Sequence, residues 1–273
     1  MSGEQRTLPD FDDPPIVETA LSVEFATLAK WRVPHFGLFW HEIHNDYDRF
    51  EVQSPLASQV EKFGIEARIP QTLKAELLLE PPVRCWFISK SDTRLIQVQN
   101  DRFVHNWRKA GTAEGYPHYE NIRPTFEREW TRFCAFLESN SIGRPDVRQC
   151  EITYVNHIEP GKAWNTLADL PNVLACWSGT WSGDFLATPE VVAVNAAFVI
   201  PNNRGRLHIS LQPAVRHADA KEILQLTLTA RGKPAAADTA SILNWFDLGR
   251  EWIVRGFTDF TSTKMHKLWK RKQ

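Results

Sequence analysis

The stretches RLHISLQPAVR (206–216) and EILQLTLTA (222–230) decide the fold, because both alternate apolar with polar residues. Side chains on a β-strand point to opposite faces in turn, so this alternation indicates strands with one buried and one open face. The apolar positions are mainly leucine and isoleucine, whereas the polar positions are mainly glutamine, threonine, serine and histidine. An antiparallel sheet that buries one face on a core and leaves the other open accommodates this pattern.

Further strands and helices follow from the same reasoning. Aromatic residues at helical spacing predict amphipathic helices over 35–49 and 119–138, and a long helix from Asp238 onward. We also expect a helix over 166–177 and an extended segment within 67–79. The pair Asn100-Asp101 marks a turn or bulge. The remaining predicted strands are 16–28, 83–90, 94–108, 147–158 and 191–200.

These elements have a similar order in two parts of the chain. Residues 1–15 are acidic and rich in proline, so we expect a flexible lead. Residues 16–145 and 146–273 each begin with a strand and continue through a helix and further strands to a final helix. The sequence therefore predicts an α+β fold in two similarly ordered halves, with helices packed on one face of an antiparallel sheet. This order is similar to TATA-binding-protein-like and split βαβ-like folds, and that analogy carries no function.

Composition restricts the compartment and the partners. The chain has 273 residues and a formal net charge of -1, so it has no overall attraction to nucleic acid or anionic membrane. Its four cysteines do not form a disulfide framework, which favours a reducing, cytoplasmic compartment. No apolar run approaches the ~18 residues that span a bilayer, and the first residues lack a signal peptide.

The open side of the sheet is the predicted binding surface. A face that is only solvated usually carries more lysine and glutamate than these strands do. Glutamine and threonine suit hydrogen bonding to a peptide, a second subunit or a nucleic acid. The alternative is an ordinary exposed sheet, because threonine is a good strand former. The candidate residues are Gln97, Gln99, Arg102, Asn106, Arg108, Thr153, His157, His208, Ser210, Gln212, Gln225, Thr227 and Thr229.

A loop near residue 180 is a second candidate contact. Trp177 and Trp181 lie among serine and glycine residues. They form either a mobile aromatic contact loop or two anchors that fix the loop to the core.

Known catalytic and metal-binding motifs fail on spacing. His41 and His44 are three residues apart, whereas a zinc-protease helix needs histidines four apart. The segment 179–183 places Trp181 where a nucleophile elbow needs serine. Dinucleotide and phosphate-binding glycine loops are absent from the sequence. We therefore predict no catalytic residue, metal or cofactor.

Two alternatives to a binding module remain open. A hydrolytic enzyme would use Arg102, His105, Asn106 and His157, provided that their strands bring them together. A nucleic-acid-binding protein would use the sheet face, although the neutral charge disfavours it. Its phosphate contacts would come from Arg102, Arg108, Arg206, Arg216 and Arg231.

Several segments carry a family resemblance. Residues 14–18 (PPIVE) are followed by distinctive stretches along nearly the whole chain. These are FGLFWHEIHNDY (36–47), LIQVQNDRFVHNWRK (95–109), YENIRPTFEREWTRF (119–133), CEITYVNHI (150–158) and EWIVRGFTD (251–259). The chain resembles a sporadically distributed family of uncharacterised prokaryotic proteins of about this length. The resemblance implies an accessory gene in a mobile or defence-related setting, and it implies no activity or catalytic residue.

Together, these observations predict a non-catalytic binding or assembly module. We expect it to act through the polar face of its sheet. The expected partner is a second copy in a homodimer or another protein.

Overall fold

The computed structural model describes residues 7–64, 83–111, 115–178, 185–187 and 189–272. Its helices are α1 (Pro34–Ile43), α2 (Tyr119–Ser139), α3 (Thr239–Phe260) and α4 (Thr263–Leu268), with short 3-10 helices η2 (Leu167–Asn172) and η3 (Pro201–Asn203). Its strands are β1 (Ile16–Phe25), β2 (Arg49–Gln53), β3 (Arg84–Ile88), β4 (Arg94–Gln99), β5 (Arg102–Arg108), β6 (Val147–Ile158), β7 (Val194–Ile200), β8 (Gly205–Arg216) and β9 (Lys221–Gly232).

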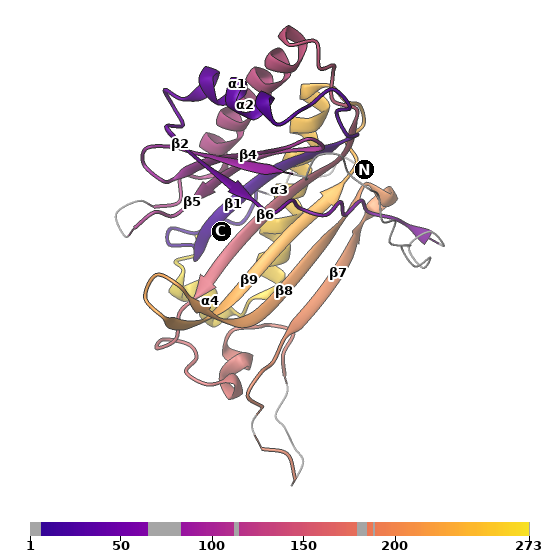
Figure 1. Ribbon diagram of the computed structural model, residues 1–273. Helices are drawn as coiled ribbons and strands as arrows, with labels where there is room; N and C mark the ends of the chain where they lie inside the picture. Colours follow the sequence, from indigo (N-terminus) through magenta and orange to yellow (C-terminus); the bar gives the residue numbers. More distant parts are fainter. Residues whose placement is uncertain (1–6, 65–82, 112–114, 179–184, 188, 273) are drawn as a thin grey trace.

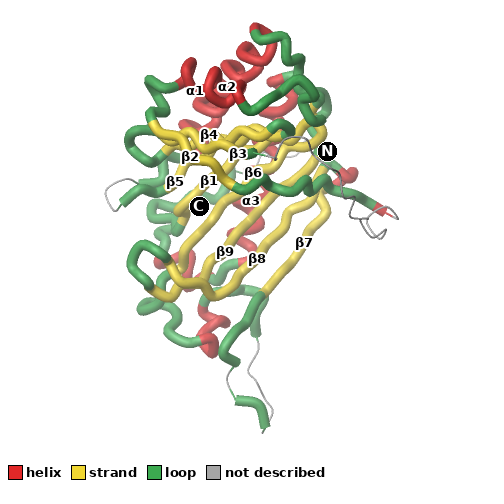
Figure 2. Tube along the Cα trace, viewed as in Figure 1, coloured by secondary structure: helices red, strands yellow, loops and turns green. Residues whose placement is uncertain are grey.

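The described strands form one antiparallel sheet in the order β2-β3-β4-β5-β1-β6-β9-β8-β7. The two strands β1 and β6 meet at its centre and pair along the whole of β1. Strands from residues 16–145 lie on one side of this pair and strands from 146–273 on the other (Figure 1). Figure 2 shows the twisted sheet with α3 behind β6, β9 and β8. The predicted α+β class and antiparallel sheet are confirmed.

Aromatic side chains join the helices to the first half of the sheet. Phe39 of α1 lies 5.6 Å from Phe87 of β3, measured between ring centroids. In α2, Trp130 lies 5.6 Å from Phe103 of β5, and Phe126 lies 4.9 Å from Phe246 of α3. Edge-to-face contacts of this kind add to the burial of each ring. The predicted aromatic stripes of α1 and α2 therefore face one shared core.

The helix α3 covers the second half of the sheet. Asp238 caps it by accepting a hydrogen bond from the Ser241 backbone N–H at 2.8 Å. Gly249 and Gly256 let the helix lie close to the strands. A Cβ at Gly249 would lie 2.6 Å from Ile152 Cγ2, and one at Gly256 would lie 2.6 Å from Leu207 Cδ2. No helix among the described residues is long and apolar enough to cross a membrane.

Local structure differs from the sequence-based expectation in several places. Helix α1 ends at Ile43, and residues 49–53 form an edge strand that the helical pattern concealed. The predicted helix over 166–177 is a single 3-10 stretch with Pro171 inside it, because proline removes a helical hydrogen bond. The pair Asn100-Asp101 forms a turn, one of the two predicted alternatives, and it divides the predicted strand 94–108 into β4 and β5. The segment 67–79 lies outside the described residues.

Part of the predicted flexible lead is held in place. Phe11 forms a β-bridge with Arg271, and the Lys272 N–H donates to the Asp10 carbonyl at 2.9 Å. The Phe11 ring is buried 5.5 Å from the Phe257 ring of α3. Residues 10–13 therefore pair with residues 269–272 and close one side of the helix layer.

Candidate binding surface

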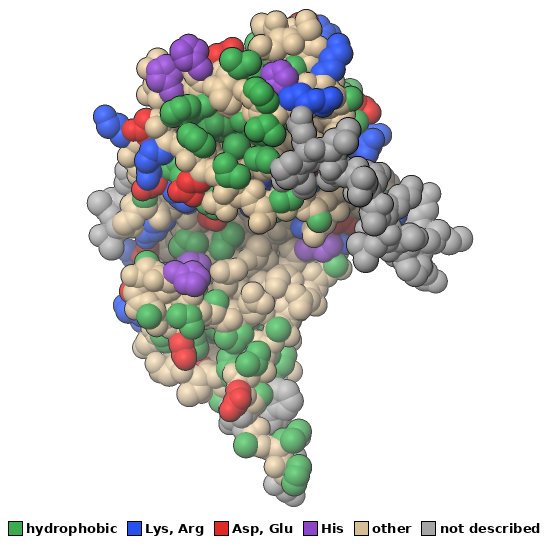
Figure 3. Space-filling view, viewed as in Figure 1, with side chains coloured by type: hydrophobic (Ala, Val, Ile, Leu, Met, Phe, Trp, Pro, Cys, Tyr) green, Lys and Arg blue, Asp and Glu red, His purple; other side chains and the backbone are tan. Residues whose placement is uncertain are grey.

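Strand register places all thirteen candidate residues on the sheet face opposite the helices, which we call the open face. For example, Thr153 of β6 pairs with Thr229 of β9, which pairs with His208 of β8. Intervening positions, such as Ile152 and Leu228, point to the helix side and are buried. Figure 3 shows few charged side chains on this face over β6, β9 and β8.

The protein's own chain covers part of the open face. Residues 54–63, which we call the strap, follow β2 and cross in front of the strands in Figure 1. The Ser54 carbonyl accepts from Arg84 on β3, and Leu56 is hydrogen-bonded to Gln99 on β4. The strap then contacts β5, β1, β6 and β8 in spatial order. These contacts are Ala57 with Arg102, Ser58 with Glu24, Gln59 with Gln149, and Glu61 with Arg206 and His208.

The strap is nearly fully extended. Six strand-to-strand steps separate β3 from β8, which is roughly 29 Å at the usual spacing. The nine residues from Ser54 to Lys62 are joined by eight steps, which reach at most about 28 Å. The strap therefore crosses the strands in an extended conformation, and long side chains such as Arg84 and Glu61 complete its end contacts.

Two glutamine side chains hold the strap by its backbone. Gln99 Oε1 accepts from the Leu56 N–H at 2.9 Å, and Gln99 Nε2 donates to the Leu56 carbonyl at 3.0 Å. Gln149 Oε1 accepts from the Glu61 N–H at 2.8 Å, and its Nε2 donates to the Gln59 carbonyl at 2.9 Å. A primary amide matches a peptide group because it carries both a donor and an acceptor. These contacts do not depend on the strap's side chains.

Charged groups fix the strap at two further points. Arg102 donates to Glu24 at 2.7 Å in a buried ion pair, and the Ser58 hydroxyl donates to Glu24. At the far end, Glu61 contacts Arg206 and lies 2.5 Å from His208 Nε2. Burial alone would raise the pKa of the Glu61 carboxyl. The hydrogen bond to His208 and the neighbouring cations lower it by more than burial raises it, so the pKa lies below its usual value.

A second polar network is buried near β4 and β5. Gln97 Oε1 accepts from Arg84 at 2.7 Å and from Trp86 at 2.9 Å. Gln97 Nε2 donates to Asn106 Oδ1 at 2.8 Å, and Asn106 Nδ2 donates to Glu18 at 2.5 Å. Burial raises the pKa of Glu18, and the Asn106 hydrogen bond partly offsets this. The sequence predicted an exposed surface here, but Gln97, Gln99, Arg102 and Asn106 are buried and bonded within the protein.

Another part of the open face is accessible, although the candidate Thr229 beside it is buried. Thr227, Ser210 and Asn195 lie side by side on β9, β8 and β7, and His157, Gln225 and Gln212 form a parallel row on β6, β9 and β8. We call these six residues the uncovered rows. Their side chains are exposed or half-buried, and no described strap residue is hydrogen-bonded to them. Between them and the strap, Thr153 and Thr229 hydrogen-bond to each other at 3.0 Å.

A groove adjoins the uncovered rows at the end of β6. Its volume is about 1040 Å³, and His157, Gln225, Val155 and Glu18 line it from the open face. The Nδ1 atom of His157 is buried and has no hydrogen-bond partner among the described residues. Burial and the charge of Arg216 lower the pKa of His157. This imidazole is therefore neutral, and its Nδ1 atom can still form a hydrogen bond at the groove wall.

The five arginines proposed for phosphate contacts are each paired with an acidic side chain. Arg102 is paired with Glu24, Arg108 with Asp92, Arg206 with Glu61, Arg216 with Glu159 and Asp219, and Arg231 with Glu151. Neutralised guanidinium groups contribute little to phosphate binding, which depends on uncompensated positive charge. The electrostatics of the open face therefore favour an uncharged hydrogen-bonding partner.

The residues considered for hydrolysis do not share one site. His105 points to the helix side of β5, whereas Arg102 and Asn106 lie on the open face. Register places His157 roughly 25 Å along the strands from Arg102. A reacting centre needs its groups within hydrogen-bond reach of one another. Among the described residues, histidine, cysteine and acidic side chains form no group of three that could hold a metal.

The tryptophan loop is only partly described. Trp177 is half-buried and packs against the hydrophobic core, as an anchor would. Trp181 lies outside the described residues.

Sequence reasoning missed the residues that hold the strap. Glu24 and Gln149 occupy polar positions of alternating strands, so alternation alone would have placed them on the open face. The strap itself has no periodic pattern, and only its contacts in space identify it.

No protein-family model matches the chain, and no curated protein matches it. The fold and the surface therefore define it as an α+β protein with an open polar sheet face that its own chain partly covers.

Proposed function

We propose that this protein is a non-catalytic binding module that holds an extended segment of a partner protein on its open face. The strap is the observation that carries this proposal. Gln99 and Gln149 already bind the backbone of an extended chain segment, at Leu56, Gln59 and Glu61. The same chemistry recurs in the uncovered rows, whose side chains are glutamine, threonine, serine, asparagine and histidine.

The uncovered rows run parallel to the strap because both cross the strands. A partner segment laid along Gln212, Gln225 and His157 would meet one polar side chain at each strand, about 4.8 Å apart. Its own rise of about 3.3 Å per residue lets peptide groups reach successive side chains. Recognition of this kind reads the backbone, so it tolerates variation in the partner's sequence.

The groove gives the partner segment a place for its side chains. Beyond His157, it is lined by the apolar side chains of Met265, Leu268 and Trp269 and by Lys109 and Lys162. Apolar walls with a few polar groups are typical of binding sites. A partner segment with one bulky apolar residue near an acidic residue would fit this combination.

Peptide selection followed by affinity measurement tests the proposal. Peptides from a random display library should be enriched on the protein and bind with measurable affinity in fluorescence anisotropy. Thr227→Lys and Gln225→Lys should weaken that binding tenfold or more, about 1.4 kcal/mol, because each places a charge in an uncovered row. Thr131→Lys, the matched change on the exposed side of α2, should leave it unaltered. Equal binding by all three variants would contradict the proposal.

Homodimerisation through β7 is a second candidate. The edge strand β7, VNAAFVI, contains no charge, proline or glycine, and Asn195, Ala197 and Val199 are exposed. Natural edge strands usually carry such residues to prevent pairing with other chains. Two β7 edges related by a two-fold axis would pair antiparallel and extend the sheet. Light scattering after size exclusion should show a dimer that Ala197→Lys converts to a monomer, whereas a monomeric wild-type chain would exclude it.

A further inference from the structure

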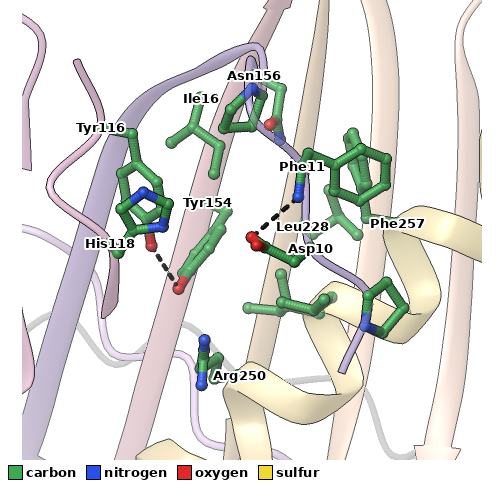
Figure 4. A pocket seen from close by; sticks show the side chains of 14 residues that line it. Asp10, Phe11, Ile16, Tyr116, His118, Tyr154, Asn156, Leu228, Arg250 and Phe257 are labelled. Carbon is green, nitrogen blue, oxygen red and sulfur yellow. Dashed lines mark hydrogen bonds between the residues drawn. The ribbon is translucent and has the colours of Figure 1, made fainter. Parts of the chain in front are cut away.

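A small pocket lies on the helix side of the sheet, away from the open face. It is enclosed by β1, β6, β9, α3, the loop before α2 and the chain segment 9–16 (Figure 4). Its volume is about 70 Å³. The lining residues are Pro9, Asp10, Phe11, Pro14, Ile16, Tyr116, His118, Tyr154, Asn156, Leu228, Arg250, Ile253, Val254 and Phe257.

One part of the pocket is apolar. Ile16, Leu228 and Phe257 come from β1, β9 and α3, and Figure 4 shows them around the cavity near Phe11. Segment 9–16 forms a wall that the pairing of residues 10–13 with 269–272 holds in place. Transfer of a small apolar group from water into this part of the pocket is favourable, and it requires no buried hydrophobic residue to become exposed.

Hydrogen-bond donors gather at the other end. The Tyr116 hydroxyl donates to the Tyr154 hydroxyl at 3.0 Å, so the proton of Tyr154 remains available to a third group. Burial raises the pKa of Tyr154 to about 12, which keeps this hydroxyl protonated. Arg250 projects toward the same place in Figure 4. Its guanidinium donates to Glu120 at 2.7 Å and lies over the Tyr119 ring, and Glu120 takes only one of its five N–H groups.

Backbone strain occurs beside these donors. His118 has φ 63° and ψ 153°, a conformation that is nearly restricted to glycine. Its ring lies 5.3 Å from the Tyr116 ring, centroid to centroid, at the mouth of the pocket. Such strain costs on the order of 1–3 kcal/mol and is concentrated at ligand sites. The strained residue leads directly into α2.

The hydrogen-bond donors at the pocket match an anion. Arg250 is ion-paired with Glu120 at 2.7 Å and hydrogen-bonded to Tyr154, so its charge is partly offset, and its remaining N–H groups and the two tyrosine hydroxyls are the donors. The one carboxylate in the lining, Asp10, accepts from the Phe11 N–H at 2.9 Å and is paired with Lys272 at 3.3 Å. Lys272, which also pairs with Asp12 at 2.7 Å, therefore offsets part of the charge of Asp10. A carboxylate matches the guanidinium fork and accepts several hydrogen bonds at once.

We propose that this pocket binds a small monocarboxylate with a short apolar body. The carboxylate accepts hydrogen bonds from Tyr154 and Arg250, and the body lies against Ile16, Leu228 and Phe257. A cavity of 150 Å³ accommodates the six carbons of benzene, so about 70 Å³ encloses in proportion roughly three non-hydrogen atoms. Acetate and propionate exceed this by one and two atoms, which would lie at the open side of the pocket.

Calorimetric titration of the full chain with propionate tests this site. At constant ionic strength, propionate should bind saturably, whereas propionamide, which lacks the charge, should bind at least tenfold more weakly. The free amino acid alanine, used as a ligand, should also bind more weakly than propionate, because its ammonium group would enter the apolar part of the pocket. Absence of saturable propionate binding, or equal binding of propionamide, would overturn the proposal.

Paired variants locate the binding. Tyr154→Phe and Arg250→Met should each weaken propionate binding tenfold or more, as expected for the loss of a charge-assisted contact. Tyr119→Phe and Arg123→Met remove the same groups from residues that bind Asp247 outside the pocket, and both should bind propionate normally. Circular dichroism establishes that each variant is folded. Full affinity in folded Tyr154→Phe and Arg250→Met would place the ligand elsewhere and reject this site.

Discussion

Gln99 and Leu56 are joined by two hydrogen bonds, one in each direction, although 43 residues separate them in the chain. The side-chain amide of Gln99 takes the place of a neighbouring strand's peptide group. Gln149 repeats the arrangement with Gln59 and Glu61. Because Gln99 lies on β4 and Gln149 on the central strand β6, the strap is fixed to both halves of the sheet.

Removal of these amides should loosen the strap without unfolding the protein. Gln99→Leu or Gln149→Leu deletes two hydrogen bonds to the strap and should lower the opening free energy of the strap by about 1–3 kcal/mol. Hydrogen–deuterium exchange in peptides that contain residues 54–63 measures this change. Gln212→Leu, an exposed glutamine in an uncovered row, is the matched control. Unchanged strap protection in both variants would show that the glutamines do not hold it.

The ion pair between Arg102 and Glu24 should matter for global stability. Both side chains are buried, so removal of one leaves the other charge without compensation. Arg102→Met or Glu24→Leu should each lower the free energy of unfolding by about 3–5 kcal/mol, and the double variant by less than their sum. Urea denaturation gives these values. Arg144→Met breaks the exposed pair with Glu138 and should change stability little; additive effects at Arg102 and Glu24 would refute coupling.

His105 should make stability fall on mild acidification. It is buried beside Arg94 and Arg128, and its ring nitrogens have no hydrogen-bond partner among the described residues. Burial, with a smaller effect of these two cations, lowers its pKa to about 3, whereas an unfolded histidine titrates near 6.5. The unfolded chain therefore binds a proton between these values, and stability is full above pH ~6.5 and decreases below it.

The size of this effect is measurable. Between pH ~6 and ~4, His105 should contribute a slope approaching 1.4 kcal/mol per pH unit to the free energy of unfolding. Urea denaturation of wild type and His105→Leu at matched pH values isolates it, because the variant lacks this slope. Parallel curves for the two proteins would mean that His105 is already protonated in the folded state. His217, on the exposed β8–β9 turn, offers a control position for the same change.

Two helix glycines should respond oppositely to alanine. Gly249 of α3 faces the sheet, and a Cβ there would lie 2.6 Å from Ile152 Cγ2, so Gly249→Ala should destabilise by about 1–3 kcal/mol. Gly37 of α1 has open space around the added Cβ, so Gly37→Ala should stabilise by about 0.5–1 kcal/mol. Thermal unfolding by calorimetry compares them. A stabilising Gly249→Ala would mean that α3 lies farther from the sheet.

The alternating segments allowed the sheet to be predicted well, and the reason is physical. Residues such as Leu226 and Thr227 face opposite sides whatever the rest of the chain does, so local sequence assigns each side chain to a face. Strand β2 escaped detection because all but its last residue are exposed and its position at the edge of the sheet requires no buried row. Pro171 shortened the predicted helix near residue 170 for a reason that was visible in the sequence.

Exposure on the open face could not be predicted in the same way. Gln97 and Gln225 occupy equivalent positions in their alternating strands, yet one is buried in a hydrogen-bond network and the other is accessible. The difference arises from neighbours such as Arg84 and Asn106 that only the strand register brings together. The pocket beside Arg250 has the same origin, because its walls come from five separate parts of the chain.

The strap also has a consequence for the order of folding. Its contact between Glu61 and His208 closes a loop of 147 residues, whereas the β8–β9 and β4–β5 hairpins form from neighbouring residues. Contacts of long sequence separation carry a larger entropic cost and form after local ones. The strap can reach β8 only after the two central strands have paired. Docking of the strap is therefore a late step of folding. A fluorescent reporter attached near Glu61 would report when the strap docks on the completed sheet.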